Sequence, residues 1–359
     1  MKKPFGKAAS IGAALALVVA AAGAAPGARA QQPDYLYVCN QDGASVSIID
    51  LATLEVVKTL DLQKMGFSAT AKPHHVVVEP DGSFWYLTLI GENKVVKLDR
   101  DNRVVAQAEF ETPGLMTLLP KQHMLYVGRS MSAVNPPQRI GVIDAKDMSI
   151  DEVEVFFPRP HALDSRPQGD YVYSASLAVN QLISLNTKTE ATKLVSLDGP
   201  AHSLAHSAIS PDGHWLAITT HMPHMIVFDL SDPAEPKMTK MVPVGEMPWY
   251  PVFTRDGATV FVANNGSSDV SVVDAKTWTV TKTITDPGLS QAYGSTLSPD
   301  GRYVFVTGNN AKGGYTSKKA GVEAADVGTV VVIDVASQMV NKVIEVGKGP
   351  TGLGVRHTQ

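Results

Sequence analysis

Short runs of valine, threonine and aromatic residues, separated by polar turns, recur along most of the chain. The runs have the length of β-strands, and no long stretch shows the 3.6-residue apolar period of an amphipathic helix. Three stretches align with one another: YLYVCNQDGASVSIIDLATLEVVKTLDL, VFVANNGSSDVSVVDAKTWTVTKTITD and YVFVTGNN…GTVVVIDVASQMVNKVIEV. Each consists of an aromatic-valine strand, a polar turn, a second strand ending in Asp, another turn and a third strand. The pattern predicts an all-β protein built from internal repeats.

Turn residues recur at fixed places in these repeats. The second strand is closed by an aspartate in six copies: Asp50, Asp99, Asp144, Asp229, Asp274 and Asp334. A further short strand, ending in a Pro-Asp-Gly turn, precedes most copies, as at Pro80–Gly82, Pro211–Gly213 and Pro299–Gly301. Such residues form tight turns between antiparallel strands. The unit is therefore four strands in about 40 to 50 residues, which is the size of a propeller blade.

The short strand that precedes each copy is the first strand of a blade, so counting these first strands gives the number of blades. They lie near His74, Pro113, Pro160, Ser203, Pro248, Ala292 and Pro350. The last has no following strands, and the three strands from Tyr35 to Leu62 have no preceding one. The chain ends should therefore complete one blade together, which removes a free sheet edge. The sequence predicts a seven-bladed β-propeller over residues 31–359, with the last blade closed by N-terminal and C-terminal strands.

The first 30 residues read as a secretory signal peptide. Lys2, Lys3 and Lys7 precede an apolar run, and Ala28-Arg29-Ala30 has the form of a cleavage site. A membrane anchor is the alternative, but the apolar run is short for a span. No later segment is long and apolar enough to cross a bilayer. We therefore expect a periplasmic or secreted protein.

Charge and cysteine content narrow the function further. Removing the four basic residues of the signal from the net charge of −4 leaves −8. With no clustered basic run, a nucleic-acid partner is excluded. Cys39 is the only cysteine, so no internal disulfide can form in the oxidising compartment. Stability must come from the core, which about 330 residues can supply.

The repeats resemble those of YVTN-type seven-bladed propellers of bacterial exported proteins. The segments FVANNGSSDVSVVD and YVFVTGNN carry the resemblance, which covers essentially the whole mature chain. That superfamily includes surface proteins, amine dehydrogenase subunits and the haem d1 domain of nitrite reductases. The resemblance therefore implies the fold and leaves the activity open.

Histidines and aromatic residues recur at matched positions near the start of the first strands. Counting back from the turn proline, His75, His206 and Tyr250 are aligned, and one position earlier lie His74, His161, Trp249 and Tyr293. First strands line a propeller's central channel, so these residues should meet at its mouth. His202 lies in the link before His206 and would take part from outside. The tyrosines and Trp249 would either pack as channel wall or contact a cofactor.

Converging neutral imidazoles are the usual protein ligands of copper, zinc, iron and nickel. The arrangement of His74, His75, His161 and His206 resembles the copper-cluster propeller of nitrous oxide reductase and the channel histidines of haem d1 propellers. The chain lacks the accompanying cupredoxin and c-type haem domains, and without C-x-x-C-H no covalent haem c is expected. The alternative is a rim of histidines that bond to carbonyl groups and water.

Three functions from different classes remain open. The leading one is an exported propeller that binds a metal, copper favoured, or a redox cofactor at the histidine-lined mouth, with a redox or envelope protein as partner. The second is a cofactor-free scaffold that presents its loop face, including the insertions at 129–139 and 309–327, to a partner protein or the cell envelope. The third is a hydrolase or lyase. The turn HMPHM, His221 to Met225, and Cys39 are either structural or soft-metal ligands.

Overall fold

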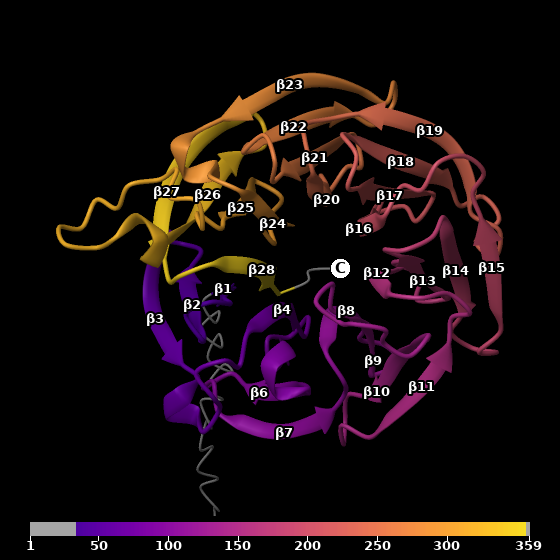
Figure 1. Ribbon diagram of the computed structural model, residues 1–359, viewed down its shortest axis with the longest axis horizontal. Coiled ribbons are helices and arrows are strands. Elements are labelled where there is room, and N and C mark those ends of the chain that lie inside the picture. Colours follow the sequence, from indigo (N-terminus) through magenta and orange to yellow (C-terminus); the bar gives the residue numbers. More distant parts are fainter. Residues whose placement is uncertain (1–33, 357–359) are drawn as a thin grey trace, which may run out of the picture. The chain divides into compact units, whose positions relative to one another are not determined.

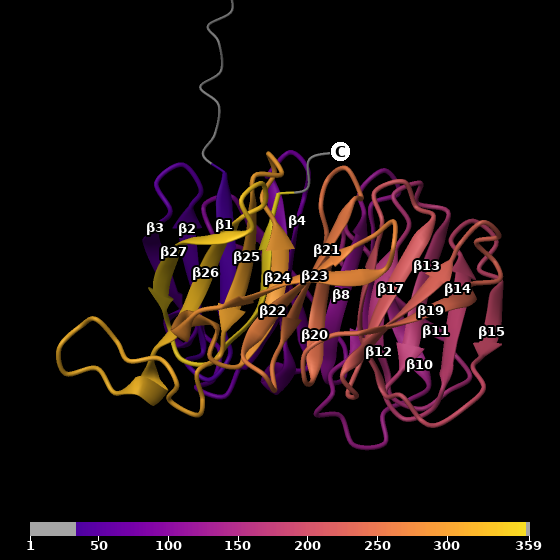
Figure 2. The same ribbon diagram turned by 90° about the horizontal axis from the view of Figure 1, so that it is seen from above.

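The computed structural model describes residues 34–356, and the signal peptide expected at 1–30 lies outside them. The described residues form seven four-stranded sheets, arranged as a ring of blades around one axis (Figures 1 and 2). The predicted seven-bladed β-propeller is confirmed. Within this part of the chain, no helix has the length and apolar character needed to span a membrane.

Each blade runs from an inner to an outer strand. The inner strands are β4 (Pro73–Val78), β8 (Pro113–Leu119), β12 (Pro160–Ser165), β16 (Leu204–Ile209), β20 (Pro248–Phe253), β24 (Ala292–Leu297) and β28 (Pro350–Val355). The second strands are β1 (Tyr35–Asn40), β5 (Phe84–Leu89), β9 (Met124–Arg129), β13 (Tyr171–Ser176), β17 (Trp215–Thr220), β21 (Thr259–Asn264) and β25 (Tyr303–Gly308).

The outer half of each blade completes the sheet. The third strands are β2 (Ser45–Asp50), β6 (Lys94–Asp99), β10 (Arg139–Asp144), β14 (Gln181–Asn186), β18 (His224–Asp229), β22 (Asp269–Asp274) and β26 (Gly328–Asp334). The outer strands are β3 (Glu55–Asp61), β7 (Val104–Glu109), β11 (Ile150–Glu154), β15 (Thr192–Ser196), β19 (Lys237–Pro243), β23 (Thr279–Thr285) and β27 (Met339–Val346). Short 3₁₀ turns are η1 (Gln63–Met65), η2 (Ile90–Glu92), η3 (Pro287–Leu289) and η4 (Ala324–Asp326).

The second and third strands form the core. Most of them are buried along nearly their whole length, whereas the outer strands are mostly exposed. Both faces of the middle strands are covered by the neighbouring blades, so these strands are continuous apolar runs rather than alternating ones. Tyr37 and Trp85 illustrate the contact between blades, since their rings stack 4.5 Å apart. The side chains of the aromatic-valine runs therefore form the apolar layers between neighbouring blades.

The two chain ends close the ring as predicted. β28 pairs antiparallel with β1, with Tyr37 opposite Gly354 and Val38 opposite Leu353. β28 also packs beside β4 so closely that a Cβ on Gly352 would lie 2.2 Å from the carbonyl oxygen of His74. Only glycine fits there without displacing backbone. The C-terminal strand therefore fixes the position of the first histidine-bearing strand.

The recurring aspartates form the predicted turns. Asp50 and Asp274 each accept hydrogen bonds from backbone N–H groups two and three residues further on. The remaining blade has Asn186 in this place with the same two bonds, because an amide oxygen accepts as a carboxylate does. The seventh copy was missing from the sequence comparison only because its turn residue is asparagine.

The link into every inner strand passes through one residue in the left-handed region. Six of these are not glycine (Lys72, Thr112, Arg159, Ser203, Met247 and Gln291), and the seventh is Gly349. Left-handed backbone is uncommon outside glycine, asparagine and aspartate. Its recurrence in all seven blades shows that the blade geometry requires it, and it directs each chain segment into the start of the inner strand.

Candidate functional site

A β-bulge near the start of the inner strands positions the candidate residues. In β4 the pairing with β5 skips from Pro73 to Val76, and in β16 the pairing with β17 skips from Leu204 to Ser207. The same shift occurs in β20, from Pro248 to Pro251, and in β24, from Ala292 to Ser295. The skipped residues include the predicted site residues His74, His75, His206, Trp249, Tyr250 and Tyr293. Bulged residues are released from strict alternation and can be aimed at one site.

Threonines on the second strands hold three of these bulges. Thr88 accepts a hydrogen bond from the backbone N–H of His75, and Thr219 accepts one from that of His206. Thr219 also donates to the carbonyl oxygen of Trp249 in the next blade. Thr307 accepts in the same way from Gly294. These hydroxyls satisfy backbone groups that the bulge removes from the sheet ladder.

Replacing Thr219 by Val should lower the free energy of unfolding by about 2 kcal/mol, because the His206 N–H and the Trp249 carbonyl would both be buried without partners. Chemical denaturation at pH 7.5 measures the change. Thr239→Val is the matched control, since Thr239 donates one bond to Val227 from the exposed strand β19. Equal losses in the two variants would contradict the role given to Thr219.

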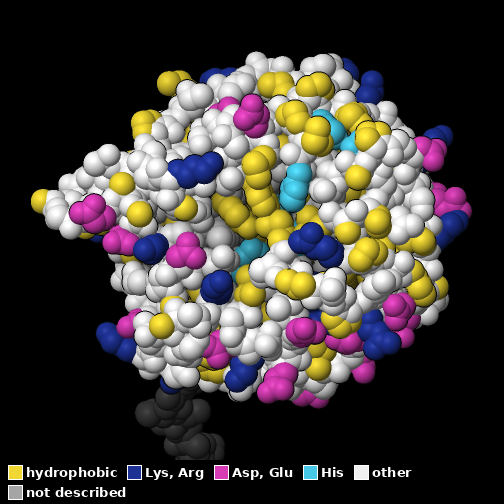
Figure 3. All heavy atoms as spheres, viewed as in Figure 1, with side chains coloured by type: hydrophobic (Ala, Val, Ile, Leu, Met, Phe, Trp, Pro, Cys, Tyr) yellow, Lys and Arg dark blue, Asp and Glu magenta, His cyan; other side chains and the backbone are white. Residues whose placement is uncertain are grey.

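The structure brings the predicted histidines and aromatic residues together at one end of the axis. We call this group the mouth cluster: His74, His75, His161, His206, Trp249, Tyr250 and Tyr293. The ring centre of His206 lies 5.1 Å from that of His161, 5.0 Å from Trp249 and 4.1 Å from Tyr250. Figure 3 shows histidine beside apolar side chains in the hollow at the centre of this face.

Hydrogen bonds fix which nitrogen carries the proton in two of the histidines. Nδ1 of His161 lies 2.7 Å from the carbonyl oxygen of Arg129, and Nδ1 of His74 lies 2.8 Å from Oε1 of Gln41. Both oxygens can only accept, so each Nδ1 must be the donor. In the neutral ring, Nε2 then carries a lone pair. Both Nε2 atoms are buried, and neither has a hydrogen-bond partner among residues 34–356.

Further polar atoms of the mouth cluster are also buried without a partner in the described part of the chain. They are both ring nitrogens of His206, Nε1 of Trp249 and the hydroxyl of Tyr250. Such atoms are exceptional in folded proteins, because each unpaired buried group costs about 1–3 kcal/mol. Their concentration in one place, from four blades, indicates a site that a ligand or ordered solvent completes.

Burial keeps these imidazoles neutral. It lowers the pKa of His74 to about 3, with His161 and His75 adding to the effect. It lowers the pKa of His161 to about 4, against the opposing hydrogen bond to Arg129. Burial, together with the neighbouring histidines, also holds the pKa of His206 well below its ordinary value. All three are therefore available as lone-pair donors at neutral pH.

His75 differs from its neighbour in the sequence. Its Nδ1 accepts a hydrogen bond from the backbone N–H of Met116, so in the neutral ring the proton is on Nε2. Its ring stacks on Tyr250 with centres 6.3 Å apart. The adjacent histidines thus present opposite chemistry to the cluster: a lone pair from His74 and an N–H from His75.

His202 lies outside the mouth cluster and pairs with a residue that the sequence analysis did not connect to it. Its Nδ1 lies 3.1 Å from Nε2 of His224. Both residues lie on the same face, His202 in the link before β16 and His224 as the first residue of β18. The shared face was inferable from the propeller geometry, but the register that joins these two rings was not.

Other candidates take structural positions. Cys39 is fully buried in β1, and burial raises the pKa of its thiol. In the HMPHM turn, Met225 is buried in the core while Met222 is exposed. Asp164 of β12, which the sequence analysis passed over, accepts bonds from the Ser165 and Ile209 N–H groups, and burial raises the pKa of its carboxyl to about 7.

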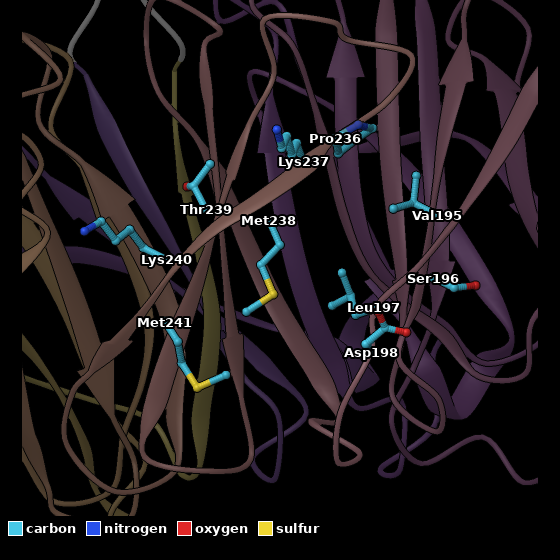
Figure 4. Close-up of a pocket in the computed structure, with 10 residues that line it drawn as sticks. All are labelled: Val195, Ser196, Leu197, Asp198, Pro236, Lys237, Met238, Thr239, Lys240 and Met241. Atoms are coloured by element: carbon cyan, nitrogen blue, oxygen red, sulfur yellow. The ribbon is translucent and has the colours of Figure 1, made fainter.

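A shallow groove of about 480 Å³ lies elsewhere, between segments 195–198 and 236–241. Figure 4 shows its lining on β15, β19 and the adjoining loops, at the outer edge of two blades. Its side chains include Met238, Met241 and Leu197 but no histidine. The buried unpartnered atoms of the mouth cluster are a stronger sign of a binding site than this open groove.

The side chains of the mouth cluster fit a transition-metal ion in their chemistry, although they do not already surround one. Within residues 34–356, no three or more His, Cys, Asp or Glu side chains already stand around one metal position. The donor set nevertheless suits a transition metal, since it offers neutral imidazoles with free lone pairs. Metal–nitrogen bonds of about 2.0–2.1 Å allow two bound rings to have centres roughly 5 Å apart. His161 and His206, at 5.1 Å, meet that condition.

No protein-family model matches the chain, and no curated protein matches it. Solved structures do match. The periplasmic gluconolactonase of Pseudomonas aeruginosa is 18% identical with a TM-score of 0.69, over 90% of this chain and 99% of that one. Kuenenia stuttgartiensis hydrazine synthase is 15% identical with a TM-score of 0.65, over 88% and 99%. The dihydro-haem d1 dehydrogenase NirN, in complex with DHE, is 16% identical with a TM-score of 0.57, over 92% and 77%.

These likenesses show the fold alone. The expected likeness of fold to haem d1 propellers is confirmed by NirN. The YVTN family name, copper and the periplasmic location stay predictions, because identities of 15–18% carry no residue roles across.

Proposed function

We propose that this protein is an exported propeller that binds a transition-metal ion, with copper favoured, at the mouth cluster. The ligands would be Nε2 of His74, Nε2 of His161 and a ring nitrogen of His206. One observation carries the proposal. Two imidazoles from different blades have their Nδ1 protons fixed by oxygen acceptors, while the opposite nitrogens are buried and unpartnered.

This arrangement is the one that metal-binding histidines need. A ligand histidine donates its second N–H to a carbonyl or carboxamide, which sets the tautomer and makes the ligand more basic. The Arg129 carbonyl and Gln41 would have that role here. Copper is favoured because divalent copper binds nitrogen ligands most strongly among the first-row metals. No thiolate competes, since Cys39 is fully buried with a raised pKa.

The surrounding aromatic residues would shield the bound ion. Trp249, Tyr250 and Tyr293 pack against His206 and one another. His75 would stand in this wall as a hydrogen-bond donor rather than as a ligand. NirN is named for an action on dihydro-haem d1 and the Pseudomonas aeruginosa propeller is periplasmic, which supports, by analogy of fold, a redox setting outside the cytoplasm.

The test is metal content of protein expressed with its own leader and without a histidine tag. After loading with copper and removal of excess, the wild-type protein should hold about one ion per chain at this site. His161→Ala/His206→Ala should lose that ion and keep its circular dichroism spectrum. His123→Ala/His214→Ala, which removes two exposed imidazoles, should keep it.

Equal copper in the wild type and the His161/His206 double variant would refute the proposal. Binding of a partner protein that is weakened by the double variant, without bound metal, would instead support a cofactor-free scaffold. Mass spectrometry of the purified proteins after copper, zinc and iron loading separates these outcomes.

A further inference from the structure

Two imidazoles outside the mouth cluster face each other on the loop side of the propeller. Nδ1 of His202 and Nε2 of His224 are 3.1 Å apart, and the rings meet at 86° with centres 5.1 Å apart. His202 lies in the link before β16, and His224 is the first residue of β18, 22 positions further along the chain. We call them the rim pair.

The backbone holds the rim pair in place independently of the rings. The N–H of His202 donates to Oδ1 of Asn180 over 2.8 Å, and its carbonyl accepts from the N–H of His221. The carbonyl of His224 accepts from the hydroxyl of Thr220. His202 is only 3% exposed, whereas His224 is half-buried. One ring is therefore fixed in the protein and the other lies at the surface.

The spacing of the two facing nitrogens matches that of two ligands on one metal ion. With metal–nitrogen bonds of about 2.0–2.1 Å, adjacent ligand atoms in square or tetrahedral geometry lie roughly 2.8–3.4 Å apart. We propose that His202 and His224 form a second site for a divalent transition metal, copper or zinc, with water completing the coordination. This site stands apart from the mouth cluster and holds whether or not that cluster binds metal.

The proton balance of binding is simple. In the metal-free rim pair, one of the two facing nitrogens must carry the hydrogen of the hydrogen bond between them. When a metal binds both as lone-pair donors, that hydrogen moves through solvent to the other nitrogen of the same ring. Both imidazoles stay neutral, and no oxidant or reductant takes part. His221 is not counted as a ligand, because its ring lies toward Trp249, with centres 5.8 Å apart.

The rim pair can be isolated from the mouth cluster by working in the His161→Ala/His206→Ala protein. Titrated with copper(II) alone, this protein should still bind about one ion, with the electron paramagnetic resonance signature of two nitrogen ligands. Adding His224→Ala should abolish that signal. Adding His214→Ala, at an exposed imidazole elsewhere, should leave it unchanged.

Two results would overturn the rim site: no copper bound by the mouth variant, or an unchanged two-nitrogen spectrum after His224→Ala. His224→Gln serves as a second variant if the alanine variant unfolds, since its amide can still bond to His202. If the mouth cluster does not bind metal, the copper titrations give a different result. In that case the wild type and the mouth variant bind the same amount of copper, and His224→Ala alone removes it.

Discussion

Lowering the pH from 6.5 to 4.5 should destabilise the metal-free protein by several kcal/mol. His74 and His161 have pKa values of about 3 and 4 in the folded state, because burial opposes their charged forms, and the pKa of His206 is lowered as well. In the unfolded chain they titrate near 6.5. Below that pH the unfolded state binds protons that the folded state does not. Each such group then lowers the free energy of unfolding by about 1.4 kcal/mol for each unit by which the pH falls.

The measurement is urea denaturation of chelator-treated protein at intervals between pH 7.5 and 4.5. Most carboxylates titrate below this window, but Asp164, whose pKa is raised to about 7 by burial, takes up its proton within it and offsets part of the loss. His206→Leu should flatten the curve, since one of the groups that must stay neutral is gone. Thr239→Val, which removes no titratable group, should leave the slope as in the wild type. Parallel curves for the wild type and His206→Leu would show that His206 is charged or solvated in the folded protein.

The propeller could be predicted from the sequence because its signals are local and repeated. A proline or small residue begins most inner strands, an Asp-Gly turn ends several of them, and an aspartate closes nearly every third strand. The predicted first strands near Pro113, Pro160 and Pro248 begin at those residues in the structure. Ring closure followed from counting, because β1–β3 lack an inner strand and β28 lacks the other three.

The alignment of the site residues was also predictable, but the reason they converge was not. Strict alternation along a strand would send His74 and His75 to opposite faces. The bulge between Pro73 and Val76 removes that restriction. Nothing in the segment AKPHHVVVEPDG marks a bulge, since its cause lies in another strand, where Thr88 bonds to the His75 N–H.

The chemistry of each histidine depends on partners that are distant in sequence. His74 is set by Gln41 and His161 by the carbonyl of Arg129, which lie 33 and 32 residues away. A backbone carbonyl leaves no mark in a sequence, so the tautomers could be assigned only from the structure. The same holds for the rim pair. The sequence placed His202 and His224 on one face, and only the packing of the link before β16 against the start of β18 joins their rings.

Leucine in place of His206 should stabilise the metal-free protein at pH 7.5, whereas leucine in place of His161 should not. Both nitrogens of His206 are buried without partners, and leucine has a similar volume. His206→Leu should therefore raise the free energy of unfolding by about 1–3 kcal/mol. The loss of the aromatic contact with Tyr250 reduces that gain. His161→Leu should gain little or nothing, because removal of its unpartnered Nε2 is offset by leaving the Arg129 carbonyl without its donor.

Copper should reverse the first of these effects. A ligand that binds only the folded state stabilises it by about 2.7 kcal/mol at one hundred times its dissociation constant. The wild type would then equal or exceed His206→Leu in stability, while both leucine variants would gain nothing from the mouth cluster. The comparison is best made on a His224→Ala background, so that the rim pair contributes nothing. If His206→Leu is destabilised without metal, the His206 nitrogens are already paired with ordered water, and the argument for a ligand at the mouth loses its main support. If it is stabilised and no longer responds to copper, then the protein retains a destabilising histidine because that residue binds the metal.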